Sequence, residues 1–135
     1  MLKTLIVEDD FVSRRILQRQ LTKFGECDVA INGLEALNAF KESVQSGSPY
    51  SLICLDIQMP ELDGLELLEI IRKIESENGI DPVKVIVTTS TKDPKTVLSS
   101  FKLGCEGFVA KPFDVGILLR EISKLGVNYS QSNPV

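Results

Sequence analysis

The sequence contains no histidine, and its three cysteines, Cys27, Cys54 and Cys105, are scattered without a C-x-x-C spacing. The absence of histidine excludes a Ser-His or Cys-His nucleophile pair and removes the commonest metal ligand. An odd number of dispersed cysteines supports neither a disulfide framework nor a zinc site, so we expect buried reduced thiols.

Long apolar runs and an excess of basic charge are also missing. No stretch approaches ~18 consecutive apolar residues, and the N-terminal run Leu2–Val7 is too short for a signal peptide. Lys and Arg number 15 against 19 Asp and Glu, and this net charge of -4 argues against nucleic-acid and anionic membrane surfaces. We therefore expect a cytoplasmic protein that binds neither nucleic acid nor membranes.

The composition that remains is that of one globular domain. With 135 residues, 43% hydrophobic and 25% charged, the chain fits a single core, and no repeat or low-complexity segment interrupts it. We expect this domain to cover residues 1–126 and to be followed by a polar tail over residues 127–135 that frays.

Short apolar or β-branched runs alternate with amphipathic segments along the whole chain. The runs predict five strands, over residues 2–7, 27–31, 51–56, 82–89 and 106–110. A helix is expected after each strand, the third opening at Gly64, the fourth capped by Asp93 and the last capped by Asp114. This alternation predicts a doubly wound α/β fold with right-handed crossovers.

Polar groups stand at the carboxyl ends of the first, third, fourth and fifth strands; in chain order they are Asp9, Asp10, Asp56, Thr88 or Thr89, and Lys111. Open parallel sheets gather such groups on one edge. Asp9 and Asp10 alone could be ordinary helix-start acids, but a charge at Asp56, after a fully apolar strand, is costly without a partner. Their co-occurrence at separate strand ends favours a functional site.

The gathered residues have a chemistry in common. Carboxylates held close together repel one another unless a cation neutralises them. A few oxygen ligands favour Mg²⁺, which keeps several of its waters, and Mn²⁺ could substitute. A carboxylate beside such a metal can attack phosphorus and form an aspartyl phosphate, and Asp56, Lys111 and Thr89 match the nucleophile, cation and hydroxyl of that reaction.

Four segments of the chain resemble the response-regulator receiver domain, the family of the chemotaxis regulator CheY. In chain order they are Val7–Asp10, Leu55–Pro60 followed by Asp63-Gly64, Thr89-Ser90, and Gly107–Phe113. Each is weak alone, but together they are highly specific, and the match runs from Leu2 to Leu125. The resemblance implies a stand-alone CheY-like, flavodoxin-like receiver whose five-stranded parallel sheet has the order 2-1-3-4-5 and carries five helices.

The resemblance also implies a role for each carboxylate. Asp56 would accept phosphate from a phosphohistidine on a histidine kinase or a histidine phosphotransfer protein. Mg²⁺ would be bound by Asp10, Asp56 and the backbone carbonyl of Gln58, while Asp9 would act through a metal-bound water.

Other residues would form the switch that the resemblance implies. Lys111 would pair with the phosphate next to a cis Lys111-Pro112 bond. Thr89 would be the switch hydroxyl and Phe108 the switch aromatic, which lacks the hydroxyl of the more frequent tyrosine. Thr88 competes for the switch role, but the distance from Thr89 to Lys111 matches the family without a gap.

The resemblance suggests a phosphorylation-dependent switch rather than an enzyme, with self-phosphorylation and autodephosphorylation as its only reactions. Side chains at Gln58 and Thr91 would tune how fast water attacks the acyl phosphate. Phosphorylation would alter a face made of the fourth helix, fifth strand and fifth helix, and this face would bind a downstream target protein.

Three alternatives stay open at this point. The first is a phosphorelay intermediate that passes its phosphoryl group on to a histidine phosphotransfer protein. The second is a phosphohydrolase with an aspartate nucleophile, which usually needs a second acid where this chain has Gln58. The third is a flavodoxin-like flavin binder, in which Glu8, Asp9 and Asp10 would repel the flavin phosphate unless a metal intervened.

Overall fold

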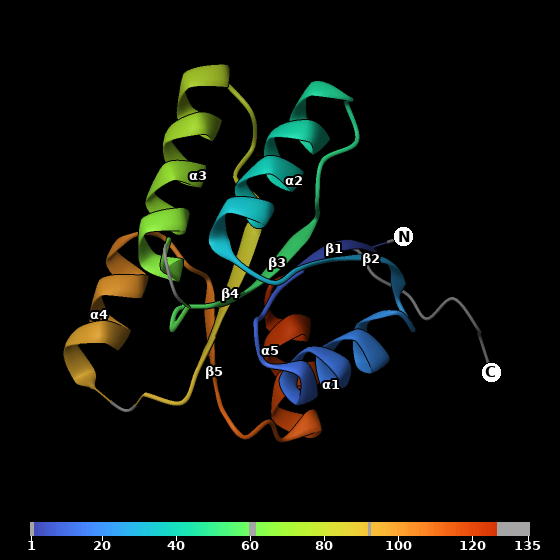
Figure 1. Ribbon diagram of the computed structural model, residues 1–135, viewed down its shortest axis with the longest axis vertical. Coiled ribbons are helices and arrows are strands. Elements are labelled where there is room, and N and C mark those ends of the chain that lie inside the picture. Colours follow the sequence, from blue (N-terminus) through green and yellow to red (C-terminus); the bar gives the residue numbers. More distant parts are fainter. Residues whose placement is uncertain (1, 60–61, 92, 127–135) are drawn as a thin grey trace.

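The computed structural model describes residues 2–59, 62–91 and 93–126, which form a parallel sheet covered by helices on both faces (Figure 1). The strands are β1 (Leu2–Val7), β2 (Gly25–Ala30), β3 (Leu52–Asp56), β4 (Lys84–Thr89) and β5 (Gly107–Ala110). All neighbouring strands pair in parallel, and their order is β2-β1-β3-β4-β5. The predicted fold and strand order are confirmed.

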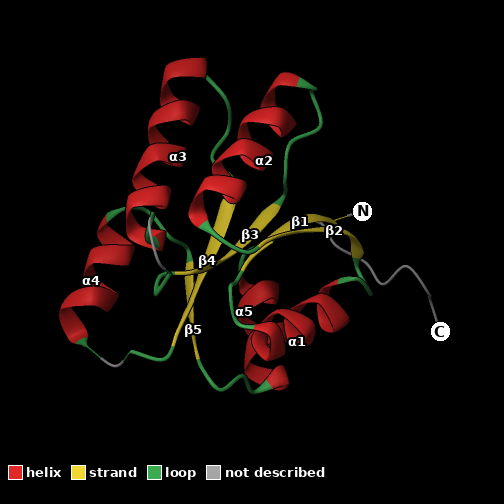
Figure 2. Ribbon diagram, in the orientation of Figure 1, coloured by secondary structure: helices red, strands yellow, loops and turns green. Residues whose placement is uncertain are grey.

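The helices are α1 (Phe11–Leu21), α2 (Gly33–Gln45), α3 (Gly64–Asn78), α4 (Pro94–Lys102) and α5 (Val115–Lys124). Figure 2 shows α2, α3 and α4 on one side of the strands and α1 and α5 on the other. Each helix follows an Asp or Asn whose side chain accepts a backbone N–H of the first turn; these caps are Asp10, Asn32, Asp63, Asp93 and Asp114. Such caps satisfy backbone donors that a helix start otherwise leaves unpaired.

Four of the strands begin at other residues than the sequence predicts, and two of these, β3 and β5, begin only one residue later, at Leu52 and Gly107. The second strand begins at Gly25 rather than Cys27, and the fourth begins at Lys84 rather than Pro82. Gly25 starts the strand because the chain passes very close to Leu2 there: a Cβ on Gly25 would lie 1.9 Å from the Leu2 carbonyl oxygen. Only glycine fits at this position, where the backbone φ is 157°.

Alternating side chains of the strands fill two apolar layers. One layer packs Leu5, Ile53, Leu55, Val85 and Val87 against α2 and α3, and the other packs Leu2, Ile6, Leu52, Cys54 and Ile86 against α1 and α5. All five residues of β3 are buried, which confirms its prediction as a strand covered on both faces. The polar end of this strand is therefore held in place from both sides.

The cysteines and the chain's hydropathy agree in part with the expectations. Cys54 and Cys105 are buried free thiols, as predicted, whereas Cys27 is half-buried. Burial raises the pKa of Cys54 to about 12 and that of Cys27 to about 11, so neither is a reactive thiolate at neutral pH. Among the described residues, no helix is long and apolar enough to cross a membrane, and the predicted polar tail lies outside them.

Candidate functional site

The carboxyl ends of β1, β3 and β5 bring together two carboxylates and a lysine. Glu8 follows β1, Asp56 ends β3 and Lys111 follows β5. The Lys111 ammonium forms an ion pair with Glu8, and its Nζ lies 3.1 Å from Oδ2 of Asp56. Glu8 is fully buried, Asp56 is 2% exposed, and the Lys111 side chain is 14% exposed. The site is a largely buried ion-pair cluster.

The Asp56 carboxylate is held in place through both of its oxygens. Oδ1 accepts the backbone N–H of Gln58 at 2.9 Å, while Oδ2 faces Lys111. The third helix can approach this strand end because its first residue is Gly64: a Cβ there would lie 2.5 Å from the Asp56 carbonyl oxygen. The carboxylate is thus preorganised by the turn after β3.

The cis bond that the resemblance implied, Lys111-Pro112, is present in the structure. The backbone N–H of Lys111 donates to the carbonyl oxygen of Thr89 at 2.9 Å and so continues the pairing of β5 with β4. The lysine is therefore anchored beside the end of β4, which is where the sheet brings it to Asp56.

The structure groups Glu8, Asp9 and Asp56 as the carboxylates that could share a cation: each presents an oxygen within 4.8 Å of those of the other two. Asp10, which the resemblance implied as a metal ligand, is not part of this group. Its carboxylate accepts the backbone N–H of Ser13 at 2.8 Å and caps α1. Because Asp10 is committed to the helix start, Glu8 takes its place beside Asp9.

A signal for Glu8 was present in the sequence. It is the first charged residue after the apolar run of β1, just as Asp56 is the first charged residue after the apolar run of β3. The bond from Asp10 to Ser13 lowers the pKa of Asp10, as expected when a carboxylate accepts a helix N–H. The sequence did not separate Asp10 from Glu8 because three consecutive acids offer the same chemistry and only the chain path distinguishes them.

Burial and neighbouring charge have opposite effects on the pKa values of Glu8 and of Lys111. Burial raises the pKa of Glu8 to about 7, although the hydrogen bond with Lys111 partly counteracts it. Burial alone would lower the pKa of Lys111, but the hydrogen bond to Glu8 and the charge of Asp56 outweigh it, so its pKa is raised. The lysine therefore stays charged and the two carboxylates compete for it.

The cluster fits a hard divalent cation. Its donors are oxygens only, and three carboxylates against one lysine leave an excess of negative charge that a divalent ion would neutralise. Mg²⁺ is suited to such a site because it keeps several waters and binds few protein ligands. Glu8, Asp9 and Asp56 are the side chains that would hold it.

The roles of Asp9 and Asp10 in metal binding can be tested by replacing each with asparagine, its isosteric amide. Asp9→Asn removes a carboxylate from the cluster, and we expect it to weaken Mg²⁺ binding by about 30-fold, within the range for a disturbed metal site. Asp10→Asn should leave the affinity within about two-fold, because asparagine caps a helix as well as aspartate does. Isothermal titration with MgCl₂ measures both, and a larger loss for Asp10→Asn would restore Asp10 as the ligand.

The side chains of Thr88 and Thr89, the two threonines at the end of β4, point in different directions. The Thr89 hydroxyl donates to the Gln58 side-chain oxygen at 3.0 Å and accepts the Thr91 backbone N–H at 3.0 Å. Thr88 lies opposite Asp56 in the strand register, but its hydroxyl is buried without a hydrogen-bond partner among the described residues. The structure thus brings Thr89, the preferred switch residue, into contact with the loop that carries the site.

The remaining predicted residues lie around this loop. Phe108 is half-buried in β5 and packs against the core layer under α2 and α3. Thr91 uses its backbone N–H to hold Thr89 and its hydroxyl to accept the N–H of Asp93 at 3.2 Å, which places it in the turn before α4. The side chain of Gln58 is exposed and bonds with Thr89 and Ser90.

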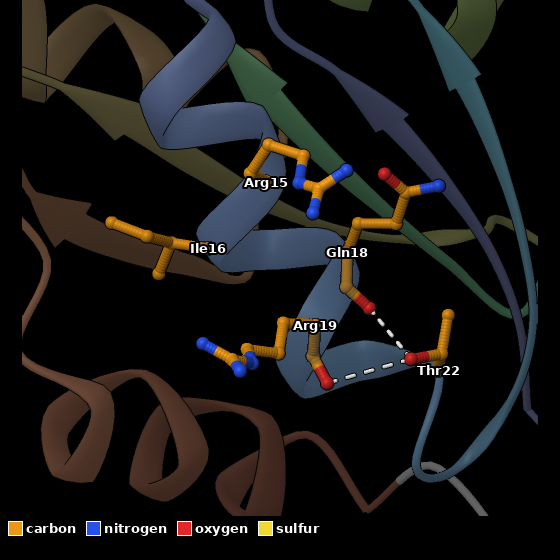
Figure 3. Close-up of a pocket in the computed structure, with 5 residues that line it drawn as sticks. All are labelled: Arg15, Ile16, Gln18, Arg19 and Thr22. Atoms are coloured by element: carbon orange, nitrogen blue, oxygen red, sulfur yellow. Dashed lines mark hydrogen bonds between the residues drawn. The ribbon is translucent and has the colours of Figure 1, made fainter.

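A hollow on α1 is separate from this cluster. It is about 480 Å³ in volume and is lined by Arg15, Ile16, Gln18, Arg19 and Thr22 (Figure 3). The Thr22 hydroxyl is already bonded to the carbonyl oxygens of Gln18 and Arg19 at the end of the helix. None of these side chains belongs to the acidic cluster.

The fold and the site together define a doubly wound α/β protein with an acidic, lysine-bearing cluster at the carboxyl edge of its sheet. The family profile described as the response regulator receiver domain matches residues 4–123. The chain belongs to this family and is a receiver domain of the two-component phosphorelay type.

Relatives place the same domain in different contexts. The chain is 34% identical over 127 residues to "Hybrid signal transduction histidine kinase L" of Dictyostelium discoideum, covering 93% of this chain and 7% of the kinase. It is 36% identical over 125 residues to "Probable transcriptional regulator ycf29" of Porphyra purpurea, covering 90% of this chain and 54% of the regulator. The chain thus spans only part of these relatives.

Solved structures support the same assignment. The receiver domain of the response regulator Ssk1 of Saccharomyces cerevisiae, co-crystallised with the histidine phosphotransfer protein Ypd1, has a TM-score of 0.81 and 30% identity, covering 93% of this chain and 88% of that one. The receiver domain of the histidine kinase CKI1 of Arabidopsis thaliana, complexed with Mg²⁺ and BeF₃⁻, has a TM-score of 0.76 and 28% identity, with 91% and 90% covered.

Proposed function

We propose that this chain acts as a response-regulator receiver that accepts a phosphoryl group on Asp56. The observation that carries this proposal is the buried Asp56 carboxylate, held by the Gln58 N–H and by Lys111 beside Glu8 and Asp9. Such a carboxylate is aimed and partly desolvated, which suits attack on phosphorus. The donor would be a phosphohistidine on a histidine kinase or a histidine phosphotransfer protein.

The reaction is a transfer between two phosphoryl carriers. An oxygen of Asp56 forms a bond to phosphorus, the bond from phosphorus to the donor imidazole nitrogen breaks, and the imidazole leaves with the electron pair. Bound Mg²⁺ would supply positive charge for the phosphoryl oxygens. Lys111 adjoins Asp56 at 3.1 Å, so its ammonium would contribute a second positive charge to the same oxygens. This chain does not turn over a substrate in this scheme and is not an enzyme.

Exposed apolar side chains beside the site support a protein donor. Phe11 and Val12 begin α1 directly after the acidic segment and are 63% and 62% exposed. A donor that reaches Asp56 must approach this edge of the sheet, where burying the two side chains would favour docking. The similarity to the Ssk1 receiver, which was crystallised with Ypd1, is consistent with a phosphotransfer protein in this position.

A second exposed apolar group supports a downstream protein target. Leu98 and Phe101 on α4 and Ile117 on α5 are 55%, 46% and 46% exposed. They flank β5, which carries Phe108. A change at Thr89 and Phe108 on phosphorylation would alter this α4-β5-α5 face and its affinity for the target.

Acetyl phosphate tests the proposed function without a partner. Wild-type protein with Mg²⁺ should gain one phosphoryl group per chain, seen as a mass increase and as an acid-stable, hydroxylamine-labile label. Chelation with EDTA should remove this labelling, because the carboxylate cluster then lacks the charge that draws in the phosphoryl oxygens. Equal labelling with and without EDTA would contradict the role of the metal, and no labelling in Mg²⁺ would contradict the function.

A further inference from the structure

The side-chain oxygen of Gln58 accepts hydrogen bonds from three donors. Its Oε1 lies 3.0 Å from the Thr89 hydroxyl, 2.7 Å from the Ser90 hydroxyl and 3.3 Å from the Ser90 backbone nitrogen. Thr89 ends β4 and Ser90 follows it, whereas Gln58 lies in the turn after β3. One amide oxygen thus ties the loop after β3 to the end of β4.

The same residue also touches the proposed phosphoacceptor. The backbone N–H of Gln58 donates to Asp56 Oδ1 at 2.9 Å. Gln58 therefore contacts Asp56 with its main chain and Thr89 with its side chain. A change at the carboxylate and a change at the threonine are linked through this one residue.

The proton of the Thr89 hydroxyl is already used in this arrangement. A hydroxyl has a single proton to donate, and that of Thr89 is donated to Gln58. Its oxygen accepts the backbone N–H of Thr91 at 3.0 Å. The hydroxyl can therefore donate to a phosphoryl oxygen on Asp56 only after it leaves Gln58.

We propose that Gln58 is a latch: its side-chain oxygen holds Thr89 and Ser90 in the unphosphorylated arrangement and opposes the switch. This inference rests on the proposed function, because it needs a phosphoryl group on Asp56 to compete for Thr89. The latch lowers the affinity of the domain for an activating ligand by the cost of breaking these bonds. It is a positioning role, separate from any effect of Gln58 on the attack of water.

The latch makes a quantitative prediction about beryllofluoride, which serves as the probe for a phosphoryl group on Asp56. In saturating Mg²⁺, Gln58→Met, which keeps the length of the side chain but lacks the oxygen, should bind beryllofluoride about five-fold more tightly, as expected when one net hydrogen bond no longer opposes the change. Ser90→Ala removes one donor of three and should tighten binding by about two-fold.

A double-mutant cycle separates the latch from a general effect on the loop. In a Thr89→Val background the switch hydroxyl is absent, so Gln58→Met should change the affinity by less than about two-fold. Gln20→Met, the same substitution on the surface of α1, should leave the affinity at the wild-type value. Isothermal titration measures all the variants, and urea unfolding checks that each is folded.

Each outcome of this experiment supports or overturns the latch or the proposed function. A tighter Gln58→Met whose gain shrinks in the Thr89→Val background supports the latch. An unchanged or weaker Gln58→Met, or the same gain in both backgrounds, overturns the latch while the proposed function stands. Absence of beryllofluoride binding by the wild-type protein overturns the proposed function and the latch with it.

Discussion

Asp56→Asn is expected to reduce phosphoryl labelling by acetyl phosphate to the background level. Asparagine keeps the shape of the side chain and can still accept from the Gln58 N–H, but its amide oxygen is not a nucleophile toward phosphorus. Glu8 should not replace it, because burial raises the pKa of Glu8 to about 7 and its carboxylate is engaged by Lys111. Intact-protein mass spectrometry after incubation with acetyl phosphate and Mg²⁺ measures the loss.

Asp63→Asn is the matched control for this loss. Asp63 lies close in sequence to Asp56 but caps α3, where its Oδ1 accepts the N–H of Glu66 at 2.9 Å. Because asparagine is an equally good cap, this variant should label as the wild type does. Retained labelling of Asp56→Asn, or equal loss in both variants, would show that Asp56 is not the acceptor.

Much of the site follows from the rule that parallel strands bring their carboxyl ends to one edge. An apolar run that ends in a charge identifies Asp56, and a lysine after the last strand identifies Lys111. The two lie 55 positions apart in sequence and 3.1 Å apart in space. The alternation of apolar runs and helices predicts a parallel sheet whose carboxyl ends share one edge, and this suffices for the prediction, whereas the strand order was implied only by the family resemblance.

The choice among neighbouring residues does not follow from that rule. Glu8, Asp9 and Asp10 are equivalent as charges, and their roles separate only because β1 ends at Val7 and α1 needs a cap at Asp10. A capping argument applied to Asp10 and Ser13 would have found this. Thr88 and Thr89 differ likewise by the alternation of side chains along β4, which turns only Thr89 toward Gln58.

One network could not be predicted, since its partners are far apart in sequence. Arg72 on α3 donates through Nη1 to Glu75 at 2.8 Å and to the Val83 carbonyl at 2.9 Å. Through Nη2 it donates to the Gly104 carbonyl at 2.7 Å and to Glu106 at 3.2 Å. In the sequence Arg72 resembles any charge on a helix surface, yet it joins α3 to the start of β4 and to the turn before β5.

Arg72 is the counter-ion of the two carboxylates in this network, Glu75 and Glu106. Glu75 is only 3% exposed, and its other oxygen accepts the Val83 N–H at 2.6 Å. Glu106 accepts the Val85 N–H at 2.6 Å and is more exposed, at 27%. Removing the guanidinium would leave the buried Glu75 carboxylate without its counter-ion.

Arg72→Met is therefore expected to lower the free energy of unfolding by about 3 kcal/mol, at the low end for a broken buried ion pair because Glu75 keeps one hydrogen bond. Urea unfolding measures this loss. Lys73→Ala, the neighbouring residue in a surface pair with 76% and 61% exposed side chains, should change it by less than about 0.5 kcal/mol. Glu75→Gln in the Arg72→Met background removes the unpaired charge, so it should recover part of the lost free energy of unfolding. If it recovers none, the loss comes from the packing of the Arg72 side-chain stem rather than from its charge.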